Sequence, residues 1–232
     1  MKRTSTIFFV LSITILCVFQ AAFGQNKEIT YADVVKMEHT AVALLRSLPH
    51  RSSMTSWVFP ERGKEASFKS VLIREIISAD RSRWIQVNDS RASFKRMEVV
   101  TIGDKNYRKI DDGAWQILPP PSVDLESPAP PAPSLAKYRF ENSARLIETK
   151  NDENGPVSVY ETISKSTRIE GGMEFSHFNT IRYWFRYDGR LLRKDMEQET
   201  AGDPRIFKNS KVYEYEGIKI EAPELNEPKT RP

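Results

Sequence analysis

Apolar residues recur at helical spacing near the start of the chain and at every second position in the rest of it. Residues 31–48 carry apolar side chains at helical spacing, and Pro49 follows as a stop signal. Thr30 is a plausible N-cap residue, with Asp33 three positions later in a layout close to a capping box. This pattern predicts one long helix near the start of the chain.

From residue 54 onwards the period changes to two, in segments rich in β-branched and aromatic residues. The breaks between these segments are short and turn-like, and Asp188-Gly189 is a strong two-residue hairpin signal. Short breaks predict antiparallel neighbours, because parallel strands need a longer crossover. The predicted strands are 54–59, 67–78, 83–87, 93–102, 107–110, 144–149, 157–164, 175–187, 191–198, 205–215 and 218–220.

Neither face of the predicted sheet is cleanly polar. Within 68–77, Val71 and Ile73 share a face with Lys69, while Leu72 shares the other with Arg74. A sheet with apolar residues on both faces needs a cover, and one helix is little cover for eleven strands. We therefore predict a mainly β (α+β) fold, an incomplete antiparallel β-barrel of about eleven strands wrapped around the N-terminal helix and enclosing an apolar hollow.

Residues 119–133 hold seven of the fourteen prolines and can form neither sheet nor helix. This segment is either a linker between two domains or a long excursion within one sheet. The excursion is favoured, because strands of the same style resume beyond it. We predict a single domain over residues 25–232, ending in a loose polar tail at 224–232.

The first 24 residues have the layout of a secretory signal peptide. Lys2 and Arg3 precede an apolar run at 7–19, and Ala22-Phe23-Gly24 supplies the small residues of a cleavage site after Gly24. The alternative is an uncleaved N-terminal anchor. Cys17 lies inside the apolar run, which favours an ordinary apolar position over a lipidation site. We therefore expect a periplasmic or secreted protein.

Composition excludes several classes of protein. The single cysteine rules out a disulfide framework and a cysteine-rich zinc module. The formal net charge of +4 falls to +2 once Lys2 and Arg3 are removed, which gives no reason to expect a nucleic-acid partner. A hydrophobic share of 39% and four tryptophans argue against disorder.

No residue pattern indicates catalysis. His39, His50 and His177 have no spacing that would pair them as metal ligands. The chain has no Gly-x-Ser-x-Gly motif, and its paired carboxylates, such as Asp111-Asp112, lie in predicted turns. We expect no catalytic residue, no metal and no cofactor, and hence a protein that is not an enzyme.

A run of basic residues surrounds the predicted strand 83–87. Two interpretations remain open: a solvated strand face, or contact with anionic lipid headgroups at the mouth of the hollow. The run comprises Arg81, Arg83, Arg91, Lys95 and Arg96.

Alternating apolar and aromatic side chains mark the candidate lining of the hollow. Ligand sites are concave and mainly apolar, but a packed core requires the same residue types. Both interpretations stay open for the whole set. The candidate lining residues are Trp57, Phe59, Val71, Ile73, Ile85, Val87, Val99, Tyr183 and Phe185.

Several turns and aromatics together resemble those of a known superfamily. The chain has Gly-Asp-Lys-Asn-Tyr at 103–107, Gly-Ala-Trp at 113–115 and Trp-Phe-Arg-Tyr-Asp-Gly at 184–189. Their order over residues 31–223 resembles the LolA/LolB/LppX-like superfamily of exported lipid- and lipoprotein-binding proteins. Segment 119–133 is not part of that pattern, and the lipid-anchoring cysteine of LppX-type proteins is missing.

The resemblance implies a half-barrel that binds a lipid or lipoprotein acyl chain without catalysis, across or within the cell envelope. The implied partner is that lipid, with an envelope lipoprotein or membrane protein as a further candidate, and we expect a monomer. The alternative is an envelope protein-interaction or stress-sensing module on the same fold, without lipid cargo.

Overall fold

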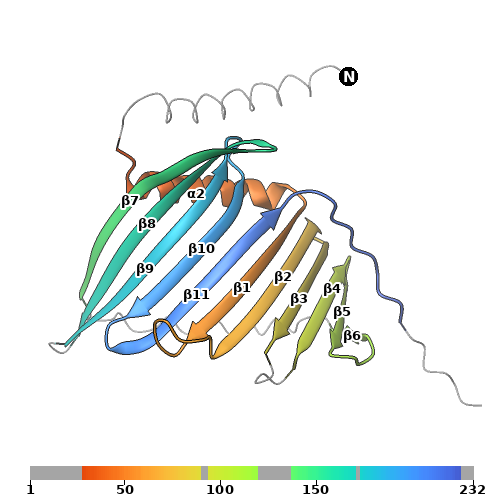
Figure 1. Ribbon diagram of the computed structural model, residues 1–232. Coiled ribbons are helices and arrows are strands. Elements are labelled where there is room, and N and C mark those ends of the chain that lie inside the picture. The colour runs from red at the N-terminus through yellow and green to blue at the C-terminus, as the bar shows by residue number, and fades with distance from the viewer. Residues whose placement is uncertain (1–27, 90–93, 120–136, 171–172, 226–232) are drawn as a thin grey trace, which may run out of the picture.

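The computed structural model describes residues 28–89, 94–119, 137–170 and 173–225. These residues form one eleven-stranded antiparallel sheet and one helix, α2 (Figure 1). The predicted signal segment 1–24 and most of segments 119–133 and 224–232 lie outside the described residues. A search of the described helix finds no stretch that is both long and apolar enough to span a membrane.

The elements follow one another in the chain as a helix and then eleven strands. Their bounds are α2 Tyr31–Ser47, β1 His50–Phe59, β2 Phe68–Ser78, β3 Arg81–Asn88, β4 Arg96–Ile102, β5 Lys105–Ile110, β6 Gln116–Leu118, β7 Lys137–Asp152, β8 Gly155–Glu170, β9 Met173–Arg186, β10 Leu191–Thr200 and β11 Asp203–Glu214.

The strand order is β6-β5-β4-β3-β2-β1-β11-β10-β9-β8-β7. The first and last strands, β1 and β11, pair in the middle, with Arg51 opposite Glu214 and Phe59 opposite Ile206. The sheet stays open, because β6 and β7 form its two edges. The chain leaves β6 at one edge and re-enters at the other, so the strands on either side of segment 119–133 belong to one sheet.

The predicted fold class and helix are confirmed. Thr30 Oγ1 accepts a hydrogen bond from the Asp33 backbone N–H at 3.2 Å, and Asp33 Oδ2 accepts one from the Thr30 N–H at 3.0 Å. This reciprocal capping box satisfies two backbone donors that would otherwise be unpaired at the helix start. The predicted turn at Asp188-Gly189 is also present, although four residues, 187–190, connect β9 to β10.

Two strand predictions were wrong. Strand β6 was missed, because three residues are too few to show a period of two. Residues 218–220 were predicted as a strand, but they join no ladder. Their alternation has another cause: Ile220 is buried against Val100 and Tyr107 and so covers part of the sheet near one edge.

The main core lies between α2 and strands β7–β11. Helix residues Val34, Ala41 and Leu45 pack against a layer of aromatic and aliphatic side chains from the sheet. In Figure 1, α2 lies behind the sheet near β8–β10. The sheet residues of this core are Tyr160, Tyr183, Phe185, Leu191 and Tyr213.

The Phe185 ring is at the centre of this core. It is 1% exposed, stacks on Tyr183 with ring centroids 5.8 Å apart, and meets Tyr160 at 6.1 Å. We expect Phe185→Ala to lower the free energy of unfolding by about 3–5 kcal/mol, because the cavity cannot collapse fully. Urea denaturation measures this loss.

Phe175→Ala is the matched control, since Phe175 lies on the same strand and face but is 43% exposed. It should change stability by no more than about 0.5 kcal/mol. Equal losses in the two variants would contradict the assignment of Phe185 to the core.

Candidate functional site

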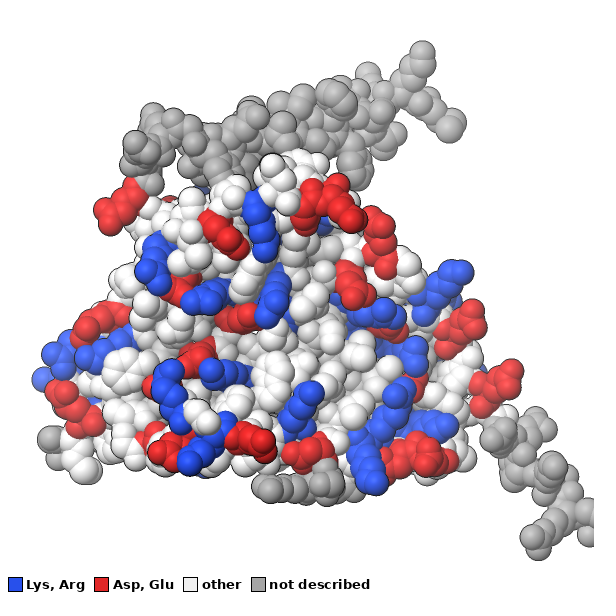
Figure 2. Space-filling view, in the orientation of Figure 1, with Lys and Arg blue, Asp and Glu red and all other residues white. Residues whose placement is uncertain are grey.

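Cross-strand pairing assigns every strand residue to one of two faces. The helix face is the side on which Tyr183 donates a hydrogen bond to Glu38 of α2 at 2.9 Å. Residues paired with Tyr183 across the ladders share that face, as do residues two positions away along a regular strand. The opposite side, toward the viewer in Figures 1 and 2, is here called the outer face.

The nine candidate lining residues do not lie together. Six of them, Trp57, Phe59, Val71, Ile73, Ile85 and Val87, lie on the outer face. The remaining three, Val99, Tyr183 and Phe185, lie on the helix face, and the last two are buried beneath α2. One hollow cannot be lined by all nine, because successive residues of a strand point to opposite sides of a sheet.

The outer face is crossed by ladders of alternating charge. Glu161, which is 3% exposed, accepts hydrogen bonds from Arg145 Nε at 2.9 Å and from Arg182 Nε at 2.7 Å. Lys and Arg side chains alternate with Asp and Glu over this face in Figure 2. Each buried carboxylate is thereby compensated, which the cost of burying an isolated charge requires.

A second ladder runs through β1, β2, β3 and β4. Arg51 pairs with Glu75, while Arg83 donates from Nε to Glu98 at 2.7 Å and Arg96 reaches the same carboxylate at 3.1 Å. Two members of the basic run seen in the sequence, Arg83 and Arg96, are therefore neutralised by neighbours. Arg91 lies outside the described residues.

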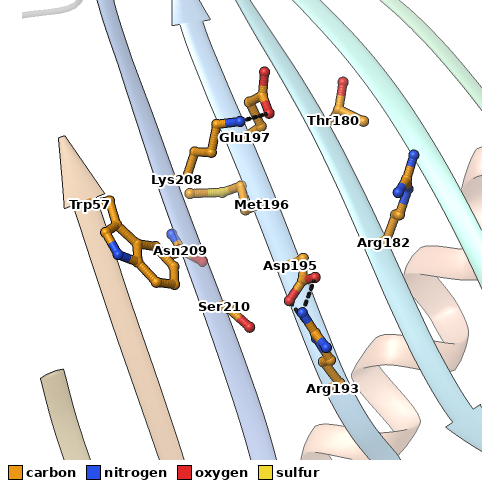
Figure 3. A pocket seen from close by; sticks show the side chains of 10 residues that line it. All are labelled: Trp57, Thr180, Arg182, Arg193, Asp195, Met196, Glu197, Lys208, Asn209 and Ser210. Atoms are coloured by element: carbon orange, nitrogen blue, oxygen red, sulfur yellow. Dashed lines mark hydrogen bonds and ion pairs between the residues drawn. The ribbon is translucent and has the colours of Figure 1, made fainter. Parts of the chain in front are cut away.

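A shallow depression of about 330 Å³ lies over β9, β10, β11 and β1 (Figure 3). Trp57 forms one side, and the other lining groups are mostly polar. Its charges are paired, Lys208 with Glu197 at 2.7 Å and Arg193 with Asp195 at 2.8 Å. Paired charges on several sides make this depression less suited to an acyl chain than a site with apolar walls throughout.

The helix face beneath α2 holds a polar group within its aromatic layer. Glu38 accepts from the Tyr183 hydroxyl and also pairs with Lys194 of β10. Burial and the nearby Glu38 charge raise the pKa of Tyr183, and the same two causes raise the pKa of Tyr213 to about 12. Both phenols stay protonated at neutral pH, so Tyr183 remains a hydrogen-bond donor to Glu38.

Much of the helix face extends beyond α2. Over β1–β4 this face carries the partly buried side chains Met54, Leu72, Trp84 and Met97. At the far ends of β7, β9 and β11, it carries aromatic rings that are substantially exposed. Those rings are Tyr138 at 54%, Phe140 at 64%, Phe175 at 43% and Phe207 at 37% exposure.

The sequence pattern missed these helix-face residues. Leu72 lies between the selected residues Val71 and Ile73, and Trp84 lies next to Ile85, whereas Met54 lies three positions before Trp57. They were not selected, because both faces of the same strands carry apolar residues. One signal could have separated the faces. Val71, Ile73 and Ile85 share their face with charged residues of the ladders, such as Glu75 and Arg83. Leu72 and Met54 lie on the helix face, which also carries Tyr183.

The histidines lie apart and make local contacts. His50 Nδ1 donates to the Leu48 carbonyl at 3.0 Å, and His177 Nδ1 lies 3.0 Å from Thr200 Oγ1. Across residues 28–89, 94–119, 137–170 and 173–225, no group of three His, Cys, Asp or Glu side chains could hold a metal ion.

Comparison with known proteins finds low-level structural similarity. No protein-family model and no curated protein sequence matches the chain. The solved structures that resemble it include a domain from Vibrio parahaemolyticus described as an outer membrane lipoprotein-sorting protein, at 10% identity and a TM-score of 0.27, covering 79% of this chain and 93% of that domain.

Two further solved structures have similar values. A DUF1329 family protein from Desulfovibrio piger is 9% identical, with a TM-score of 0.28 and coverage of 79% and 92%. A LolA superfamily protein from Nitrosomonas europaea is 7% identical, with a TM-score of 0.28 and coverage of 82% and 96%. At these TM-scores the similarity carries no inference about function, and the fold assignment rests on the strand order and the helix.

The outer ladder around Glu161 makes stability depend on pH. Burial alone would raise the pKa of Glu161, but hydrogen bonds from Arg182 and Arg145 outweigh it and lower the pKa. A carboxylate with a lowered pKa stabilises the fold above its unfolded pKa of roughly 4.3, and this stabilisation is lost as the pH falls through the folded pKa.

We therefore expect Glu161→Gln to lower the free energy of unfolding by about 1–3 kcal/mol at pH 7 and to weaken its dependence on pH in the acid range. Denaturant titrations between pH 7 and pH 3 measure both effects. Glu148→Gln is the control, because Glu148 forms an exposed pair with Lys150 at 3.7 Å. If the free energy of unfolding of Glu161→Gln fell as steeply between pH 7 and pH 3 as that of the wild type, the ladder would not be the cause of the pH dependence.

Proposed function

We propose that this protein binds a lipid or acyl chain without catalysis, on the helix face of its sheet, and carries it within the cell envelope. The observation that supports this most directly is the apolar surface that α2 does not cover. Met54 of β1 is paired with Leu72 of β2 on this face, and Trp84 of β3 is the diagonal neighbour of Leu72, opposite Arg74. Ser70 and Gln86 lie among these residues on the same face, and an apolar surface with a few polar groups is typical of ligand-binding sites.

The size of the helix explains why α2 does not cover this surface. A helix of 17 residues is about 26 Å long, whereas eleven strands spaced roughly 4.8 Å apart extend over about 48 Å. Helix α2 packs on β7, β8 and β10, and its core reaches β11 through Tyr213. Strands β1–β5 therefore keep a helix face that α2 cannot reach.

The energy available from this surface is large enough for useful binding. Removing an acyl chain from water contributes about 0.8 kcal/mol per buried methylene, or roughly 10 kcal/mol for a dozen. Association and ordering cost several kcal/mol of this. A chain that covers Met54 and Leu72 would also remove their exposed apolar area from water.

The envelope location in this proposal is supported by the signal-peptide layout of residues 1–24. The non-catalytic character is supported by the outer-face depression, whose charges are paired with one another. The candidate residues Trp57, Phe59, Val71, Ile73, Ile85 and Val87 are less suited to line the ligand, because the charge ladders run between them. The lining is therefore reassigned to the neighbouring positions on the helix face.

A pair of adjacent variants tests this assignment. We expect Leu72→Glu to abolish uptake of a fluorescent long-chain fatty acid without unfolding the protein, because the charge would lie within the apolar surface. Ile73→Glu is the matched control, since it introduces the same charge one residue away on the outer face. Fluorescence titration measures uptake, and circular dichroism verifies folding.

Native mass spectrometry of protein purified from its own compartment without detergent provides a second measurement. A lipid of defined mass, bound near one per chain, is the expected result. An apo mass together with no uptake of the fatty acid would overturn the proposal. Loss of uptake in Ile73→Glu alone would place the ligand on the outer face instead.

One observation favours a second candidate function, protein docking. The edge strand β7 has sixteen residues, and Tyr138 and Phe140 stack on it with ring centroids 6.2 Å apart while both remain exposed. A long, unpaired edge is a template for strand addition by another chain. A stoichiometric protein partner that is lost in Phe140→Arg, in a protein free of lipid, would favour this function.

A further inference from the structure

Two lysines lie directly opposite each other on the helix face. Lys194 of β10 is the register partner of Lys211 of β11. Side chains in this relation have Cβ atoms only about 5 Å apart, and like charges placed so are destabilising. Such a local conflict in an otherwise consistent structure is expected where function requires it.

Only one of the two charges is balanced. Lys194 pairs with Glu38 of α2. Lys211 instead places its ammonium group over the Tyr213 ring, 4.9 Å from the centroid. Within the described residues neither Lys211 nor Arg74, which lies close enough to repel it, makes an ion pair. Burial, and then the positive charges of Arg74 and Lys194, lower the pKa of Lys211.

Cations on the outer face of the neighbouring strands are instead paired with carboxylates. On the outer face, Glu161 is shared by Arg145 and Arg182, and Lys208, three residues before Lys211 on the same strand, pairs with Glu197. Among the described residues, the cations Arg74, Lys194 and Lys211 have one carboxylate partner, Glu38, which pairs with Lys194, so Arg74 and Lys211 make no ion pair there.

The excess charge adjoins the apolar surface that α2 leaves open. Met54 is the direct neighbour of Lys211 on β1, and Leu72 is the next residue along the same row. A cationic group beside an apolar surface is complementary to an amphiphile, with its anionic head at Lys211 and its chain over Met54 and Leu72. A phosphate head fits best, since a phosphate monoester carries roughly −1.5 to −2 charges and three acceptor oxygens.

We infer that Lys211 and Arg74 bind the phosphate head group of a lipid whose acyl chain lies on Met54 and Leu72. This inference rests on the proposed function and specifies its ligand class. Arg74 can bind phosphate oxygens through two N–H groups, while Lys211 acts as a point charge. Lys194 stays on Glu38 and keeps α2 in place beside the head group.

Two lipids that differ only in the phosphate test the inference. Monooleoyl lysophosphatidic acid and monooleoylglycerol share chain and glycerol, and each displaces a fluorescent fatty acid in titrations below its aggregation threshold. We expect the wild-type protein to prefer the phosphate lipid by about tenfold or more, the order of one charge-assisted hydrogen bond. Lys211→Met should reduce this preference to about threefold or less.

Lys208→Met is the matched control, with the same change of charge on the same strand but on the outer face, and it should keep the full preference. Arg74→Gln is a second test variant. Arg74 is exposed, so this substitution should leave the protein folded even if Lys211→Met does not, and the preference for the phosphate lipid should again fall. Urea denaturation verifies that each variant is folded.

Each other outcome overturns the inference in a recognisable way. Equal affinity for the two lipids would contradict the phosphate site but leave the proposed lipid-binding function standing. No binding of either lipid would overturn the phosphate site and the proposed function together. Loss of preference in Lys208→Met alone would place the head group on the outer face. Binding of inorganic phosphate as tightly as lysophosphatidic acid would identify a free anion site without lipid.

Discussion

The length of α2 relative to the width of the sheet constrains the whole molecule. A 17-residue helix extends over roughly half of an eleven-stranded sheet. It can bury Tyr160, Tyr183 and Phe185 completely, and this packing fixes one half of the sheet. The other half must present its helix face to something else, and the proposed lipid is suited to that surface.

The two faces of the sheet manage charge differently. On the outer face every described buried carboxylate has an arginine partner, so the charges stabilise the fold and leave no demand for a ligand. On the helix face, Glu38 compensates Lys194, but no carboxylate of the described residues pairs with Lys211 beside it. The imbalance lies where the cover provided by α2 ends, next to Met54, and this position connects the electrostatic argument with the apolar one.

The candidate site shows how far an alternating pattern can be interpreted. Ile73 and Leu72 are both apolar and adjacent, and only the register with β1 and β3 decides which of them faces α2. The selected residues Tyr183 and Phe185 are on the helix face but belong to the core. The charges at Lys194 and Lys211 could not be paired from sequence, because their separation along the chain says nothing about the ladder that places them opposite each other.

The sequence alone determined the local structure of the chain. The helix at 31–47, its capping box at Thr30 and Asp33, ten of the eleven strands and their antiparallel arrangement all follow from short-range periods and turns. The tertiary structure decided the pairing of β1 with β11, the face that α2 covers and the burial of Ile220 without a ladder. These features join residues far apart in the chain, and a sheet with apolar side chains on both faces carries no local signal for which face will be covered.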